Sequence, residues 1–305
     1  MPAPDLSPPY SLAIHLLDCR VRVTAPPEVL LPLAAMFAEA NRWAESHPAP
    51  PIIEAWVVAE RTTWGWQLLV DDEPTVTVSS PDALAGALEW QVVGVAVQRL
   101  APRYLLFHAG ALALDGRGIL LPAASRSGKT TLTAALVAAG CRYYSDDIAA
   151  LTPHDLLLHP FMRSLCIKSG SFEVLSRDYP QLASSPAYPR FRAGEVRYLA
   201  PSPEAVPDSP VPIRCIVFPR YVPGAATELI PLRRTQALPR LLDGLCNPRD
   251  QLGRDLPPLL ELLRGAECYT LTVGDLDQAV RRVLDVASGR GRLAPYSVQE
   301  GSTSV

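Results

Sequence analysis

The sequence predicts an α/β protein with an N-terminal α+β unit, a central strand–loop–helix core and a group of C-terminal helices. Three observations support this fold class. The 305 residues are enough for two domains, 48% of them are hydrophobic, and segments with strand periodicity alternate with segments of helical periodicity. A chain this apolar can bury a core, which excludes wholesale disorder.

Composition and charge exclude several classes of protein. The formal net charge of −3 provides no basic surface for general nucleic-acid binding. The longest apolar stretch, 83–100, contains Glu89, Gln91 and Gln98, and no basic segment precedes an apolar one at the N-terminus. We therefore expect no membrane span and no targeting signal. The six cysteines form no Cys-x-x-Cys pair, which predicts reduced thiols in the cytoplasm.

The first hundred residues predict an α+β domain over 1–101 that carries no recognisable chemistry. Residues 11–24 and 64–79 favour strands, and the second segment has an Asp-Asp-Glu-Pro turn between two apolar runs. Residues 27–43 and 81–101 have helical periodicity. Asp82 lies in the first turn of the second helix, where its charge complements the helix dipole.

A second domain is expected over 102–289, and it begins with strands. The apolar segments 103–114 and 119–124 are separated by an Asp-Gly-Arg-Gly turn. Residues 130–139 then predict a helix that ends at Gly140, the residue type most favoured just after a helix.

The rest of this domain alternates shorter elements with one long irregular segment. We expect a strand over 141–152, a pair of strands within 156–170, a short helix before Pro180, strands over 211–221 and 269–273, and helices over 235–246, 257–264 and 275–287. Residues 183–211 are rich in Ser, Pro and Arg and too long for an ordinary connection, so they form a lid, a substrate loop or a disordered segment. The tail, 290–305, is expected to be disordered.

A phosphate-binding loop is predicted between the second strand and the first helix of this domain. Residues 123–130 have the spacing of the motif Gly-x-x-x-x-Gly-Lys-[Ser/Thr], with Ala123 in place of the first glycine. Backbone N–H groups there would surround phosphate oxygens, Lys129 would contact the terminal phosphates, and the Thr130 hydroxyl would hold Mg²⁺. The candidate nucleotide-binding residues are Ser125, Arg126, Ser127, Gly128, Lys129, Thr130 and Thr131.

Two further observations bear on this loop. Only two of the 28 basic residues are lysines, Lys129 and Lys168, and the retention of a lysine in the loop favours a phosphate site. Ala123 would carry strain of about 1 kcal/mol if its position required a positive φ.

Two acidic residues and a histidine are candidates for the chemistry. Asp146 and Asp147 follow the predicted helix on a strand that returns beside the loop, where they form part of a metal–nucleotide site or a solvated turn at a strand end. His108 lies on the apolar strand before the loop, and it is a core histidine or a functional one.

A stretch of forty residues, HAGALALDGRGILLPAASRSGKTTLTAALVAAGCRYYSDD at 108–147, resembles the core of the bacterial HPr serine kinase/phosphorylase family. In that family a histidine, a turn, a P-loop, a helix ending in glycine and an Asp-Asp pair occur in this order at similar spacing. Ala123 and Arg126 replace glycines of that P-loop, and the whole chain is more similar to HPr-kinase-related proteins encoded beside peptide-modification genes. These proteins share a stretch that corresponds to 160–171 and contains Lys168.

The resemblance implies a P-loop kinase core of the HPr kinase/PEP-carboxykinase-like type. In that family the first aspartate of the pair is the base toward a serine hydroxyl, and the histidine assists it. These roles would fall on Asp146 and His108, while Asp147 would support the base or, with Thr130, hold the metal. Further candidates for phosphate or substrate binding are Lys168, which could also be an ordinary surface lysine, and Arg190, Arg192 and Arg197 of the irregular segment.

The function implied by the resemblance is that of a phosphotransferase, an HPr-kinase-like serine kinase that uses ATP and Mg²⁺. Its acceptor would be a serine-type hydroxyl on a peptide or protein, as in the lasso-peptide precursors that some related kinases phosphorylate. Two alternatives stay open, a non-catalytic nucleotide-binding scaffold or sensor and a kinase for a small hydroxyl metabolite. We expect a nucleotide and a peptide as partners and no nucleic acid or membrane, and a homo-oligomer stays open.

Overall fold

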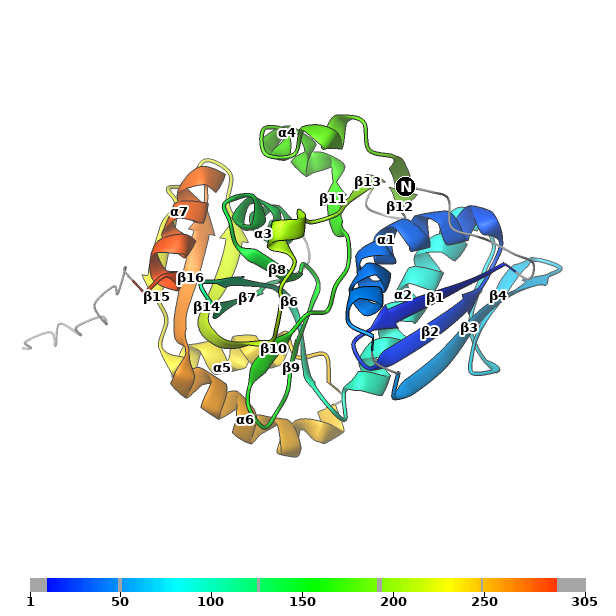
Figure 1. The fold of residues 1–305 in the computed structure, drawn as a ribbon, viewed down its shortest axis with the longest axis horizontal. Helices are drawn as coiled ribbons and strands as arrows, with labels where there is room; N and C mark the ends of the chain where they lie inside the picture. The colour runs from blue at the N-terminus through cyan, green and yellow to red at the C-terminus, as the bar shows by residue number, and fades with distance from the viewer. Residues whose placement is uncertain (1–9, 49–50, 125–126, 191–193, 248, 290–305) are drawn as a thin grey trace, which may run out of the picture.

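The computed structural model describes residues 10–48, 51–124, 127–190, 194–247 and 249–289, so the tail predicted over 290–305 lies outside the described residues. Within these ranges the chain is a mixed α/β protein with three sheets and seven α-helices (Figure 1). No helix in these ranges combines the length and the apolar character needed to span a membrane.

The N-terminal unit is a five-stranded sheet with two helices on one face. The helices lie between the sheet and the rest of the chain (Figure 1). In sheet order the strands are β1 (Ser11–Leu16), β2 (Cys19–Thr24), β3 (Ile53–Thr62), β4 (Gly65–Val70) and β5 (Glu73–Val78), and the helices are α1 (Pro27–Ser46) and α2 (Pro81–Leu100). Both predicted helices are confirmed, and β3 is a strand that the sequence analysis did not predict.

Alternation along the strands determines which face of this sheet is buried. Val21 and Val23 point toward the helices and are inaccessible to solvent, whereas Arg22 between them is exposed. At the start of α2 the Ser80 hydroxyl accepts the N–H of Ala83 at 3.2 Å, which satisfies one of the free donors of the first turn.

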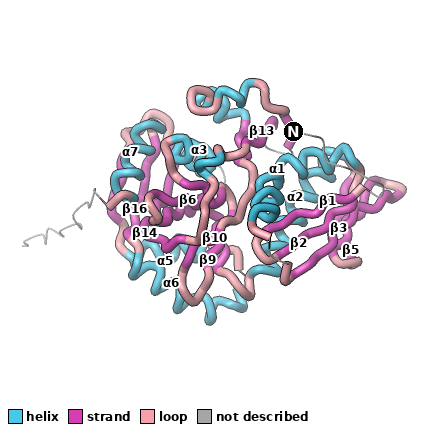
Figure 2. Tube along the Cα trace, viewed as in Figure 1, coloured by secondary structure: helices cyan, strands magenta, loops and turns pink. Residues whose placement is uncertain are grey.

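The second unit is a larger mixed sheet covered by helices on both faces (Figure 2). The strands are β6 (Leu105–Leu114), β7 (Arg117–Pro122), β8 (Arg142–Ser145), β9 (Ile148–Leu151), β10 (Leu157–His159), β14 (Val211–Tyr221), β15 (Glu228–Pro231) and β16 (Glu267–Val273). The helices are α3 (Lys129–Ala138), α5 (Arg234–Asp243), α6 (Leu252–Gly265) and α7 (Leu276–Ala287). The predicted C-terminal helices are therefore present, although α6 begins five residues before the expected Pro257.

The alternating side chains of this sheet separate two cores. Ile119 and Leu121 of β7 pack in the core that contains α3 and α7, whereas Leu120 packs in the core that contains α5 and α6. Gly110 of β6 permits the close approach of α3, because a Cβ there would lie 2.5 Å from the Thr133 hydroxyl oxygen. This close approach places α3 directly against the strand that carries His108.

Two strands of a third, smaller sheet lie in the segment predicted as a lid, a substrate loop or disorder. In sheet order the strands are β11 (Leu165–Lys168), β13 (Gly194–Leu199) and β12 (Ala187–Arg190), and the short helix α4 (Phe172–Leu175) follows β11 along the chain. Disorder over 183–211 is therefore wrong for its described residues, because Val196 and Leu199 are buried and β13 pairs on both sides. The two strands expected within 156–170 are present as β10 and β11, but they belong to different sheets and do not pair with each other.

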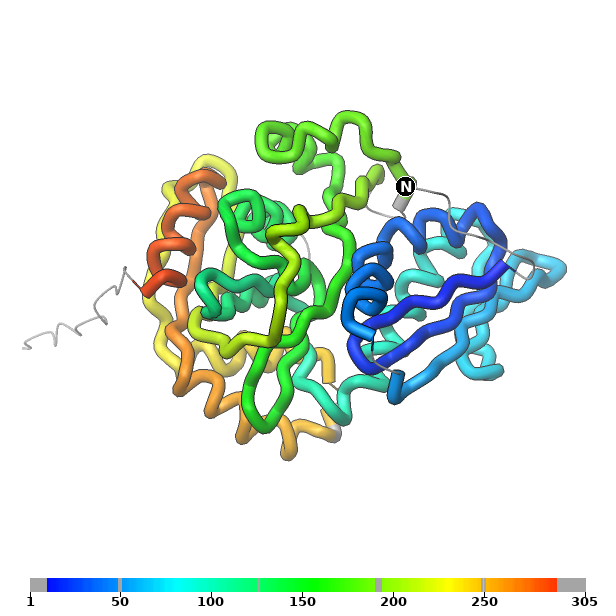
Figure 3. The backbone as a smooth tube through the Cα atoms, in the orientation of Figure 1, coloured from blue at the N-terminus to red at the C-terminus, as the bar shows by residue number. Residues whose placement is uncertain are grey.

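The two units lie side by side (Figure 3), and they share a core and a polar joint. The core of α1 and α2 continues onto Leu106, Ile148 and Phe161 of the second unit. Beside it, the buried side chain of Asn247 accepts the N–H of Leu106 at 2.8 Å and donates to the carbonyl oxygens of Ala101 and Tyr104. One side chain thus satisfies three backbone groups where α2 leads into β6.

Replacement of Asn247 tests this joint. Asn247→Ala leaves buried backbone groups without partners, so we expect the free energy of unfolding to fall by about 2–4 kcal/mol in urea titrations. Asn41→Ala is the matched control, because Asn41 also bonds two backbone groups, His15 N and Ala13 O, at a half-exposed edge where water can replace it. We expect a loss of about 1 kcal/mol or less for the control, and equal losses would contradict the role of burial.

Candidate functional site

The loop between β7 and α3 is held by the backbone of β14. Gly128 precedes α3 with φ +86°, and a Cβ there would also lie 3.3 Å from the Cβ of Tyr221. The carbonyl oxygen of Ser127 accepts the N–H of Tyr221 at 3.1 Å. Ala123 is not among the described residues with a positive φ, so the strain considered for it is absent. Ser125 and Arg126 lie outside the described residues.

A line of polar contacts joins the loop lysine to one carboxylate. Lys129, buried at the start of α3, has its Nζ 2.9 Å from Nε2 of His108 on β6. Nδ1 of His108 lies 3.1 Å from Oδ1 of Asp147. The structure therefore brings together three predicted residues from α3, β6 and the bend between β8 and β9.

The partners of His108 determine its tautomer. Asp147 can only accept at Nδ1, and the ammonium of Lys129 can only donate to Nε2. A neutral imidazole with its proton on Nδ1 satisfies both contacts at once. His108 is half-exposed, so it is not a core histidine.

The two aspartates lie at a break in the predicted strand. Instead of one strand over 141–152, the chain bends between β8 and β9, and the Ser145 hydroxyl accepts the N–H groups of Asp147 and Ile148 at 3.2 and 3.1 Å. Both β8 and β9 still pair with β6. The bend therefore puts both carboxylates beside the strand that carries His108.

Asp147 is partly accessible and strongly held as an anion. Its side chain is 31% exposed, and its Oδ2 accepts a hydrogen bond of 2.7 Å from Nη1 of Arg163. Burial raises the pKa of Asp147, but the charge of Arg163 and the contact with His108 outweigh this and hold the pKa well below its usual range.

Asp146 occupies a different environment. It is 2% exposed, and its carboxylate accepts the N–H of Cys166 at 3.2 Å and the hydroxyl of Tyr143 at 3.3 Å. Burial raises its pKa, with a smaller contribution from the charge of Asp147, and Arg163 opposes the rise. The neighbouring carboxylates therefore differ both in access to solvent and in affinity for a proton.

The remaining lysine and the helix threonines lie near this group. Burial, and to a smaller extent the charge of Lys168, lower the pKa of Lys129, whereas Asp147 and Asp146 raise it. Lys168 ends β11 and is half-buried. The Thr131 hydroxyl lies 2.7 Å from that of Ser171, so the first turn of α3 contacts the segment just after Lys168.

Of the three candidate arginines of the segment 183–211, the structure describes the side chain of Arg197, whose partners, named below, lie in 172–195 and not in the loop. Arg197 of β13 donates to the carbonyl oxygen of Leu182, pairs with Glu195 at 3.2 Å and lies over the ring of Phe172. These contacts stabilise the small sheet. Arg192 and the side chain of Arg190 lie outside the described residues.

The donor set fits a magnesium nucleotide better than a metal centre made by protein alone. Among the described residues no group of three or more His, Cys, Asp or Glu side chains could hold a metal ion. Magnesium bound with phosphates needs only one or two protein oxygens, because phosphate and water complete its shell. Thr130 and Asp147 offer such oxygens, and the Ser127 hydroxyl oxygen is buried without a partner in the described part of the chain.

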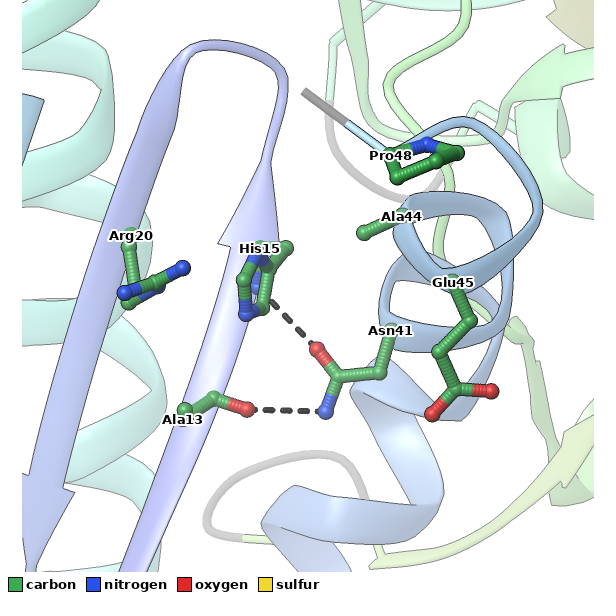
Figure 4. Close-up of a pocket in the computed structure, with 7 residues that line it drawn as sticks. All are labelled: Ala13, His15, Arg20, Asn41, Ala44, Glu45 and Pro48. Atoms are coloured by element: carbon green, nitrogen blue, oxygen red, sulfur yellow. Dashed lines mark hydrogen bonds between the residues drawn. The ribbon is translucent and has the colours of Figure 1, made fainter. Parts of the chain in front are cut away.

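A separate cavity of about 570 Å³ lies in the N-terminal unit (Figure 4). It is bounded by the outer edge of β1 and the second half of α1, and Asn41 bonds across it to the β1 backbone. Its lining contains none of the predicted site residues.

Sequence reasoning missed two residues of the site. Arg163 has only an indirect signal, since paired acids on an apolar segment require a cation. Cys246 precedes Asn247. Burial, and to a smaller extent the charge of Asp147, raise the pKa of its thiol to about 11, and the charge of Lys129 opposes this rise. The thiol is therefore protonated at neutral pH.

The comparisons with family models and curated proteins identify no family for this chain. No protein-family model matches the chain, and no curated protein matches it significantly.

The ionisation of Asp147 predicts how stability depends on pH. Because its folded pKa lies below that of an unfolded aspartate, about 3.9, its ionised form stabilises the fold above that pH, and this contribution is lost as the pH falls toward the folded pKa. We expect the stability difference between wild type and Asp147→Asn to shrink between pH 5 and pH 3.5 in urea titrations. Asp285→Asn, at an exposed site on α7, is the control variant. A constant difference for Asp147 would show an ordinary pKa.

Proposed function

We propose that this protein is an ATP-dependent kinase that transfers the γ-phosphoryl group to a serine-type hydroxyl on a peptide. The observation that carries the proposal is the line from Lys129 through His108 to Asp147, because an ammonium suited to phosphate and a carboxylate suited to accept a hydroxyl proton then lie beside one loop. A scaffold that only binds a nucleotide needs no such carboxylate. The resemblance at 108–147 supplies the acceptor class.

The nucleotide would bind at the start of α3. The N–H groups at this end of the helix and the ammonium of Lys129 favour negative phosphate oxygens. Magnesium, when bound with the nucleotide, neutralises charge on the phosphates, and the Thr130 hydroxyl is the group that would hold it. The second positive charge at Lys168 adds to the attraction for the transferred group.

The environments of the two aspartates favour Asp147 as the base, rather than Asp146 as the resemblance implies. Asp147 is ionised and partly accessible, so it can accept a hydrogen bond from an acceptor hydroxyl. Asp146 is enclosed by Tyr143 and the backbone of Cys166. Paired groups whose pKa values are pushed apart in this way are typical of sites with separate acid and base roles.

We propose that the reaction takes place in the cytoplasm. All six cysteines are free thiols in the structure, and ATP is an intracellular substrate.

Mass spectrometry of serine-containing peptides tests the function directly. Each peptide is incubated with the protein, ATP and Mg²⁺, and we expect a gain of about 80 Da, one phosphate, that requires all three. Nucleotide binding without any phosphopeptide, across peptides and small hydroxyl compounds, would favour the scaffold instead. Phosphorylation of small compounds alone would favour a metabolite kinase.

Substitution of the loop lysine tests nucleotide binding. Lys129→Ala removes one buried positive charge from the phosphates, so we expect nucleotide affinity or turnover to fall by about 10²-fold or more. We expect Lys129→Arg to lower nucleotide affinity or turnover as well, because the wider guanidinium does not fit beside His108. Calorimetric titration with ATP measures both variants, and wild-type affinity together with wild-type turnover in Lys129→Ala would exclude the loop as the site.

Paired aspartate variants identify the base. Asp147→Asn keeps the shape but removes the base, so we expect transfer to fall by about 10²–10⁴-fold while ATP affinity stays within several-fold. His108→Ala should give a smaller loss of the same kind. If Asp146→Asn abolishes transfer and Asp147→Asn does not, the base is Asp146.

A further inference from the structure

Arg163 lies where the two units meet, and it contacts a carboxylate of each. It lies in the short connection between β10 and β11, and it is 1% exposed. Nη1 donates to Oδ2 of Asp147 at 2.7 Å, and Nη2 lies 3.6 Å from Oε1 of Glu89 on α2. A single buried guanidinium therefore joins the candidate site to a helix of the N-terminal unit.

The neighbouring residue fixes this segment to the other N-terminal helix. The backbone N–H of Ser164 donates to the carbonyl oxygen of Met36 at 2.9 Å, and its hydroxyl donates to that of Ala35 at 2.7 Å. The guanidinium also lies 5.4 Å from the centre of the Phe37 ring. Both α1 and α2 thus restrain the position of Arg163.

We propose that Arg163 is a positioning residue through which the N-terminal unit holds the Asp147 carboxylate in its reactive orientation, with Glu89 as its anchor on α2. The proposal rests on the proposed kinase function. It assigns to residues 1–101, which carry no recognisable chemistry, a part in the reaction of the second unit.

The two oxygens of Asp147 explain why the arginine matters. Oδ1 contacts His108 and Oδ2 contacts Arg163, so the plane of the carboxylate is fixed from two sides. An arginine can hold two carboxylates with the two arms of its planar fork, whereas a lysine offers one point charge. Loss of the Glu89 contact would free the guanidinium to move, and Asp147 would lose one of its two restraints.

Glu89 variants test the proposal, because Glu89 lies outside the candidate site itself. We expect Glu89→Ala to lower the kcat of phosphoryl transfer at least tenfold while the Kd for ATP stays within twofold. Glu89→Gln keeps an oxygen acceptor for Nη2 and should recover most of the rate. Glu60→Gln, which removes a charge from an exposed position of β3, should leave the rate unchanged.

These outcomes separate positioning from a merely structural role. If Glu89→Ala lowers thermal stability but the folded fraction keeps the wild-type kcat, the proposal is overturned. If Glu89→Ala does not fold, Arg163→Lys provides the second variant, since it keeps the buried charge but cannot reach both carboxylates. We expect it to lose kcat without losing ATP affinity, and a wild-type kcat would overturn the proposal.

A double-mutant cycle tests the link without any enzyme assay. The free energy of unfolding is measured for wild type, Glu89→Ala, Asp147→Asn and the double variant. We expect the double variant to lose less stability than the sum of the single losses, because both residues act on one cation. Additive losses would overturn the link. If wild type transfers no phosphate, the kinase function fails and the link to a reaction fails with it, whereas additive losses in an active enzyme reject the link alone.

Discussion

A guanidinium removed from water must have anions around it, and Arg163 imposes this requirement on both units of the protein. Charges of this kind are expensive to bury unless they are paired and hydrogen-bonded. Asp147, Asp146 and Glu89 raise the pKa of Arg163 against the effect of its burial. Two of these carboxylates come from the bend between β8 and β9 and one from α2, so the acid pair of the site and the packing of the N-terminal helices share one cation.

The charges around Arg163 give the two aspartates and the histidine of the site different chemical environments. Asp147 faces cations on two sides and keeps some access to solvent, whereas Asp146 is enclosed by a phenol and a backbone amide. His108 contacts both an anion and a cation, which gives the neutral ring one orientation and one tautomer. The difference between adjacent aspartates therefore comes from their neighbours and not from their residue type.

The sequence predicts the parts of the site that follow local rules. Lys129 begins a helix after a glycine-containing loop, and the strands before and after that helix bring His108 and Asp147 beside it, so their spacing alone indicates proximity. The role of each aspartate does not follow from spacing, because it depends on Ser145 breaking the strand.

Arg163 could not be predicted from the sequence, because the connection between β10 and β11 has no helical or strand periodicity. Its partner Glu89 is recognisable in the sequence only as a charged residue within an apolar helix. The pairings of β3 with β2 and of β11 with β13 join segments that are distant in sequence, and single-sequence patterns do not contain them.

The joint made by Asn247 has a consequence for the order in which the chain acquires its structure during synthesis. Its bonds to Leu106 and Ala101, and that of Arg254 to Ala101, join residues 141 to 153 positions apart in the sequence. A ribosome that has released α1 and α2 must add most of the second unit before these partners exist. The carbonyl oxygens of Ala101 and Tyr104 therefore bond to water on the nascent chain, and the polar joint between the two units closes only after most of the second unit has been made.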